Sequence, residues 1–163
     1  MILKKGKVFQ NIVSKKVESI LYESTSSYYE FIKSAQIKGY KQNIITSDIM
    51  IKILENFLFS YNVTINEIIF LEEDYELESE IKNLINKINI NSLYWIQLKE
   101  RLLFLSNTDS IDIKKISFRC NTEKYQFLVD VFINGLFSVN SKYDDRYDIV
   151  KAKIEKLVEE NVK

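Results

Sequence analysis

Nine polar side chains near the start of the chain have the chemistry to contact a nucleic acid. Lysine ammonium groups neutralise phosphates, and serine and tyrosine hydroxyls donate hydrogen bonds to phosphate oxygens or base edges. The candidate DNA-binding residues are Lys15, Lys16, Ser26, Ser27, Tyr28, Tyr29, Lys33, Lys38 and Lys41. If residues 26–33 form a helix, it can enter the major groove while the other lysines hold phosphates.

The distribution of charge along the chain also favours contact with a polyanion. The 163 residues include 23 basic and 23 acidic side chains, so the net charge is zero. Residues 1–47 nevertheless carry eight lysines and three glutamates, a surplus of five positive charges. Much of the matching negative charge lies in the segment 67–80. This asymmetry is typical of a polyanion-binding part on an acidic body, and a Lys-rich composition also produces it by chance.

The composition argues against most catalytic and metal chemistry. The chain has no histidine, which excludes imidazole-containing triads and His-ligated zinc sites. The only cysteine, Cys120, lies near Phe118 and is expected to be a buried apolar side chain. Three glycines are too few for a Gly-rich phosphate-binding loop. We therefore expect no enzymatic activity, no cofactor and no metal.

The same sequence predicts a location inside the cell. No stretch reaches the roughly 18 uncharged apolar residues of a membrane span, and the first residues are too few for a signal peptide. A single cysteine cannot form an internal disulfide. We therefore expect a soluble, reduced, cytoplasmic protein that does not bind membranes.

The apolar spacing and the absence of proline favour a mainly α fold that positions the candidate residues. Apolar side chains recur at intervals of three and four residues, as on one face of a helix. Helices are predicted at 7–16, 17–23, 26–34, 47–58, 65–71, 76–88, 92–105, 122–137 and 145–161, and 122–137 has the broadest apolar stripe. Residues 111–120 alternate between apolar and polar side chains, which favours a short strand or an irregular link.

Two polar sequences predict helix starts. The Ser and Thr side chains of residues 24–27 offer N-cap oxygens to the helix at 26–34. Thr64 and Glu67 have the spacing of a capping box, which predicts the helix at 65–71.

The last predicted helix, 145–161, has a narrow apolar stripe. Tyr147, Val150, Ile154 and Leu157 follow heptad spacing among lysines and glutamates. Such a stripe packs either on the body of the protein or on a second copy. We expect a homodimer.

The five helices predicted before residue 75 fit a repressor-like helix-turn-helix domain. The third of them, 26–34, is then the recognition helix. Residues 76–163 form a small helical unit for dimerisation or partner binding. A plain helical bundle with solvated lysines is the structural alternative.

Several segments resemble the Rgg/PrgX-type transcriptional regulators of low-GC bacteria. Residues 6–12 (GKVFQNI) are similar to the opening of that family's DNA-binding domain, and residues 26–31 (SSYYEF) to its recognition helix. Residues 45–55 and 62–70 resemble its fourth and fifth helices. The resemblance covers about residues 5–75 and implies a helix-turn-helix that binds duplex DNA. At Glu30 the family usually has Arg, and a carboxylate repels phosphate and cannot bind guanine as Arg does.

These patterns predict a non-enzymatic DNA-binding transcriptional regulator of a mobile element or phage. The alternative is a phage-encoded anti-CRISPR protein that binds and inhibits Cas9. The expected architecture, a helix-turn-helix head joined to a compact second unit, resembles some phage-encoded Cas9 inhibitors. In that case the head is mainly a scaffold and the second unit binds the nuclease.

Overall fold

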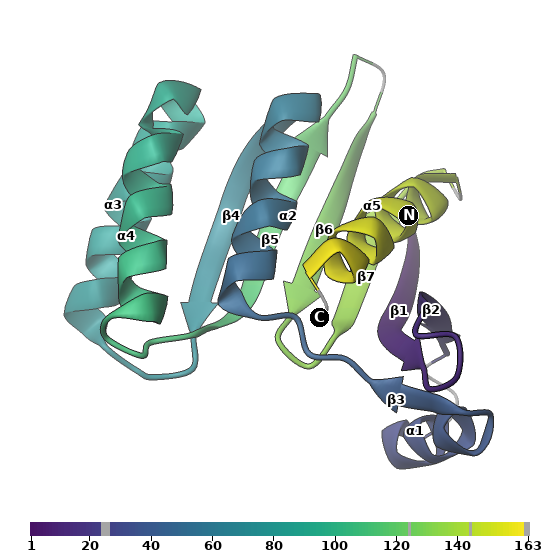
Figure 1. Ribbon diagram of the computed structural model, residues 1–163. Coiled ribbons are helices and arrows are strands. Elements are labelled where there is room, and N and C mark those ends of the chain that lie inside the picture. The colour runs from purple at the N-terminus through teal and green to yellow at the C-terminus, as the bar shows by residue number, and fades with distance from the viewer. Residues whose placement is uncertain (24–26, 124, 144, 162–163) are drawn as a thin grey trace.

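A seven-stranded antiparallel sheet forms the centre of the computed structural model, which describes residues 1–23, 27–123, 125–143 and 145–161 (Figure 1). Most helices pack against one face and one edge of this sheet, and a short helix packs on the other face. The prediction of a mainly α, all-helical protein is therefore wrong. The chain has an α/β fold.

The sheet combines strands from both ends of the sequence. The strands are β1 (Ile2–Asn11), β2 (Val17–Tyr22), β3 (Tyr40–Gln42), β4 (Asn62–Phe70), β5 (Ile113–Asn121), β6 (Gln126–Phe132) and β7 (Leu136–Ser141). Their order is β2-β1-β7-β6-β5-β4, and β3 also pairs with β1. Because β1 pairs with β7 and β4 with β5, the segments 1–75 and 76–163 share one sheet.

The helices agree with five of the predicted ones. They are α1 (Tyr28–Ile37), α2 (Ser47–Ser60), α3 (Tyr75–Ile90), α4 (Trp95–Asn107) and α5 (Asp145–Asn161), with a 3-10 turn, η1 (Ser92–Tyr94), before α4. The Ser27 and Thr46 side chains cap α1 and α2, accepting from the Glu30 and Ile49 amides at 3.1 and 3.4 Å. The strand favoured at 111–120 is confirmed as β5.

The two helices predicted at 7–16 and 17–23 are wrong, because these residues form β1, β2 and the turn between them. Successive strand residues point to opposite faces. Val8 is buried in the main core and Phe9 is buried beneath α1, so both faces of β1 are covered. A strand that is apolar on both faces loses its polar alternation and imitates helical spacing. The predicted five-helix head is therefore absent, and only α1 and α2 of it are helices.

The helix predicted at 65–71 is also wrong, because these residues lie mostly in β4. A bulge between Ile65 and Glu67 shifts the strand register, so Ile65 and Ile68, three residues apart, both reach the core. Thr64 does not cap a helix. Its hydroxyl oxygen accepts a hydrogen bond from Asn121 of β5 at 3.2 Å.

The helix predicted at 122–137 is wrong as well, because β6 and β7 form a hairpin there. Phe127, Val129 and Val131 alternate toward the main core, while apolar residues on the opposite face hid this period of two in the sequence. The turn contains Gly135 at a φ of +89°, where a Cβ atom would lie 2.3 Å from a backbone carbonyl oxygen.

The C-terminal helix α5 packs within the chain. Tyr147, Val150 and Ile154 are buried in the main core, so their stripe is covered by the sheet and does not face a second copy. The homodimer remains a prediction, but the apolar stripe of α5 does not form its interface. None of the helices formed by the described residues has the length and apolar content to cross a membrane.

Candidate nucleic-acid interface

Two turns meet at one corner of the sheet. Residues 12–16 connect β1 to β2, and residues 38–39 connect α1 to β3 (Figure 1). The Ile12 amide donates to the Gly39 carbonyl at 3.0 Å, and β3 pairs with β1 through Tyr40 and Asn11. These contacts bring four predicted residues to one place, which we call the basic end: Lys15, Lys16, Lys38 and Lys41.

The basic end is exposed and is held by local hydrogen bonds. All four lysines lie at the surface. The Asn11 side-chain oxygen accepts from the Val13 and Ser14 amides at 2.9 and 3.0 Å, which fixes the β1–β2 turn. Among the described residues, no carboxylate forms an ion pair with these ammonium groups. Their charges are therefore available to an external anion.

Helix α1 lies beside the basic end and packs on the sheet through one side. Ile32 and Ala35 are buried with Phe9 of β1. Tyr29, which is 73% exposed, and Lys33 face solvent. The helix predicted to enter DNA is thus confirmed as a helix, but strands precede it where a helix-turn-helix requires helices.

The remaining predicted contact residues have other positions. Ser27 caps α1, with its hydroxyl oxygen accepting from the Glu30 amide. Tyr28 packs edge-on against Tyr22 of β2, with ring centres 5.9 Å apart. Ser26 lies outside the described residues. The candidate surface therefore consists of the basic end together with Tyr29 and Lys33.

Two acidic side chains lie near this surface. Glu18 accepts a hydrogen bond from the Tyr40 hydroxyl at 2.5 Å, and this bond raises the pKa of Tyr40. Glu30 is exposed in the first turn of α1. Because Glu30 repels phosphates there, the two turns are better placed for phosphate contact than the start of the helix.

Acidic side chains concentrate on the opposite edge of the sheet. Strand β4 forms that edge, and α3 follows it (Figure 1). The acidic residues of β4, of the following link and of the first turns of α3 are Glu67, Glu72, Glu73, Asp74, Glu76, Glu78 and Glu80. The charges are therefore separated across the width of the sheet, and the corner formed by β1, β2 and β3 is the positive end.

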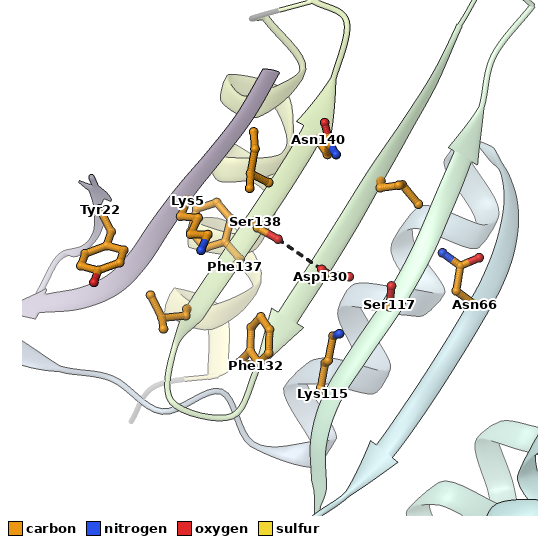
Figure 2. A pocket seen from close by; sticks show the side chains of 13 residues that line it. Lys5, Tyr22, Asn66, Lys115, Ser117, Asp130, Phe132, Phe137, Ser138 and Asn140 are labelled. Atoms are coloured by element: carbon orange, nitrogen blue, oxygen red, sulfur yellow. Dashed lines mark hydrogen bonds between the residues drawn. The ribbon is translucent and has the colours of Figure 1, made fainter. Parts of the chain in front are cut away.

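A second feature is a groove of about 500 Å³ on the sheet face opposite the main core (Figure 2). The strand register places Lys5 opposite Ser138, Ser138 opposite Asp130, and Asp130 opposite Ser117. The Ser138 hydroxyl donates to the Asp130 carboxylate at 3.4 Å. Ser117 and Ser138 are only 7% and 8% exposed, so this polar row forms the floor of the groove.

Taller side chains flank the polar row. Leu128, Phe132 and Leu136 line the groove. The Lys115 ammonium lies 5.5 Å from the centre of the Phe132 ring and 3.0 Å from the Glu67 carboxylate. The groove thus combines a hydrogen-bonding floor with apolar and aromatic walls.

Sequence reasoning missed this groove because it placed residues 7–16 and 122–137 in helices. That assignment separates Lys5 from Asp130 and Ser138, which are neighbours only through strand pairing. The available signal was the alternation of Lys115 and Ser117 with buried residues in the segment favoured as a strand.

Lys7 is fully buried between β1 and α1. Its ammonium donates to the Asn134 carbonyl oxygen and lies 5.8 Å from the ring centres of Phe9 and Tyr28. No carboxylate in the described part of the chain pairs with it. Burial lowers the pKa of Lys7 to about 8. Lys7 therefore does not belong to the exposed basic surface.

The described residues contain no group of three or more His, Cys, Asp or Glu side chains that could hold a metal ion. Cys120 is fully buried, as predicted, and burial raises the pKa of its thiol to about 12. The thiolate is the nucleophilic form of cysteine. At neutral pH the Cys120 thiol is protonated and out of contact with solvent.

No protein-family model, curated protein or solved structure matches this chain. Function is therefore inferred from the charge of the basic end and from the shape and chemistry of the groove.

Proposed function

We propose that the protein is a non-enzymatic DNA-binding regulator that holds the phosphates of a duplex at its basic end. The supporting observation is that Lys15 and Lys16 come from one segment, Lys38 and Lys41 come from another, and the two segments meet at one exposed corner. Lysine contacts to phosphates supply most of the affinity of such proteins and do not depend on base sequence.

Helix α1 extends the proposed contact surface. Lys33 adds a fifth ammonium, and Tyr29 adds an exposed ring and hydroxyl beside it. Glu30 opposes phosphate contact at the first turn of α1, so the duplex backbone is placed against the two turns of the basic end. This arrangement supports binding of the backbone and leaves the operator sequence open.

Anisotropy of a fluorescent duplex measured over a salt series tests the proposal. Four or five phosphate contacts correspond to a slope of about −4 in a plot of log K against log salt. Replacing Lys15 and Lys38 together by Gln removes two contacts and is expected to make the slope shallower by about 2.

A matched variant controls for the loss of charge. Lys82→Gln combined with Lys87→Gln removes two exposed ammonium groups from α3, which lies at the opposite edge of the sheet from the basic end. This variant is expected to keep the wild-type slope. No binding to any duplex at low salt, or an equal change of slope in both variants, contradicts the proposal.

A further inference from the structure

We infer that the groove on the sheet face opposite the main core binds an unstacked base of a single-stranded nucleic acid whose phosphates continue onto the basic end. The inference rests on the proposed function for its phosphate contacts. It adds a binding site for a base and a preference for unpaired strands.

The shape of the groove suits a planar group. Its floor is a row of short side chains, Ser138, Asp130 and Ser117, and its walls include Phe132 and Leu128 (Figure 2). A volume of about 500 Å³ is within the range of sites for small organic molecules. The aromatic and aliphatic walls offer stacking contacts to a base, and such contacts do not require a particular base.

The polar groups of the groove match the edge of a base. The Asp130 carboxylate accepts hydrogen bonds, and cytosine and adenine carry exocyclic amines that donate them. The Asn140 side-chain oxygen is buried at the groove and has no partner among the described residues. Thymine has a carbonyl oxygen where cytosine has its amine, and this oxygen is repelled by the carboxylate, so thymine can donate only through its N3–H and binds less well.

The charged groups of the groove match the phosphates of a strand. The Lys5 ammonium lies along the groove, and no carboxylate in the described ranges pairs with it. Lys115 lies on the other side of Asp130, where it is bound to Glu67. Lys5 can therefore contact a phosphate next to the bound base.

The position of the groove allows one strand to reach both sites. Lys5 and Asn11 lie on the same face of β1, six residues apart or about 20 Å along the strand at ~3.3 Å per residue. The Asn11 side chain holds the turn that carries Lys15 and Lys16 of the basic end. Tyr22 lines the groove and its ring contacts Tyr28 of α1, which continues the surface toward the lysines. Single strands of about 4–16 nucleotides fill sites of this kind.

A duplex fits the groove poorly. Its bases are stacked and paired, and only their edges are accessible, whereas the groove floor is formed by the buried side chains of Ser117 and Ser138. Unpaired bases can turn outward and stack on protein side chains. The groove therefore discriminates between single strands and duplexes, whereas the phosphates of both bind the basic end.

Competing anisotropy titrations test the inference, with labelled oligodeoxycytidylate and oligodeoxythymidylate of about 12 nucleotides and a duplex of similar length. The wild-type protein is expected to bind the cytidylate at least about fivefold more tightly than the thymidylate, since Asp130 accepts from its amine. Asp130→Asn keeps the size of the side chain and is expected to remove most of this preference.

A second experiment removes the aromatic wall of the groove. Phe132→Leu keeps an apolar side chain and is expected to weaken cytidylate binding about tenfold while duplex binding is unchanged. Phe104→Leu, which alters an exposed ring on α4, is the matched control and is expected to bind like wild type. Thermal melts of each variant establish that the fold is retained.

The outcomes separate this inference from the proposed function. Duplex binding without single-strand binding, or single-strand binding that both groove variants leave unchanged, overturns the inference and leaves the proposed function standing. Single-strand binding that the groove variants weaken, with no duplex binding, supports the inference and overturns the duplex proposal. Loss of both on replacing Lys15 and Lys38 supports the shared phosphate path.

Discussion

Replacing Lys7 with methionine is expected to stabilise the protein at neutral pH. The Lys7 side chain is fully buried. Among the described residues, its ammonium donates a hydrogen bond to the Asn134 carbonyl and lies near the aromatic rings of Phe9 and Tyr28. Methionine is an unbranched, adaptable side chain of similar length without a charge. The variant therefore fills the same space and removes a buried charge.

The pKa of Lys7 gives the magnitude of this effect. Its pKa falls from 10.5 to about 8 on burial, and one pKa unit corresponds to about 1.4 kcal/mol. Holding the ammonium in the folded protein thus costs about 3 kcal/mol at neutral pH. The variant also loses the hydrogen bond to Asn134, worth about 1–2 kcal/mol, so a net gain of about 1–2 kcal/mol is expected.

The same pKa makes the stability dependent on pH. Because the folded-state pKa lies below the unfolded one, the unfolded chain binds more protons between about pH 8 and 10.5. The free energy of unfolding attributable to Lys7 therefore rises with pH across this window. The advantage of Lys7→Met is largest at neutral pH and shrinks by about 3 kcal/mol toward pH 10.5.

Urea unfolding of wild type and variant from neutral pH to about pH 10.5 measures this difference. Lys33→Met, at an exposed position of α1, is the control and is expected to show no such trend. A difference between Lys7→Met and wild type that is the same at every pH refutes the reasoning.

Two further substitutions test the packing of the sheet. Gly6→Ala places a Cβ atom 2.5 Å from the Tyr147 hydroxyl oxygen and is expected to destabilise the protein by about 3 kcal/mol, so an unchanged melting temperature contradicts the close approach of β1 to α5. Asn89→Ala removes two 2.9 Å hydrogen bonds at the β4 edge, one that the side-chain amide donates to the Ile65 carbonyl and one that it accepts from the Ile65 amide, with an expected loss of about 1–2 kcal/mol. Hydrogen exchange of the Ile65 amide is expected to quicken in that variant and to stay unchanged in the Asn86→Ala control on the same helix; equal rates in all three proteins speak against the contact.

The helices that begin with a polar cap could be predicted from the sequence. Ser27 and Thr46 accept backbone hydrogen bonds at the starts of α1 and α2, as local sequence indicates. Such caps involve residues three positions apart and do not depend on the rest of the fold. The Thr64 and Glu67 pair has a similar pattern, but pairing of β4 with β5 overrides it.

The strands could not be predicted because their pattern depends on distant layers. β1 is buried on both faces only because α1 covers Phe9 while the main core covers Val8. The bulge after Ile65 changes a period of two into a spacing of three. In both places an apolar spacing typical of a helix arises from tertiary contacts rather than from helical geometry.

The candidate binding surface could also be predicted only in part from the sequence. The surplus of lysines is a property of composition, and the structure gathers Lys15, Lys16, Lys38 and Lys41 because two turns are adjacent. The groove depends on the register of four strands, which no local pattern specifies. The polar floor of the groove could therefore be identified only from the folded sheet.

Lysine acetylation with and without a bound duplex, read by mass spectrometry, tests the central claim most directly. The basic end is expected to be protected at Lys15, Lys16, Lys38 and Lys41, while the exposed lysines of α3, Lys82 and Lys87, react at their unbound rates. Equal protection of lysines over the whole surface, or protection that spares these four, would contradict the assignment of this corner as the contact surface.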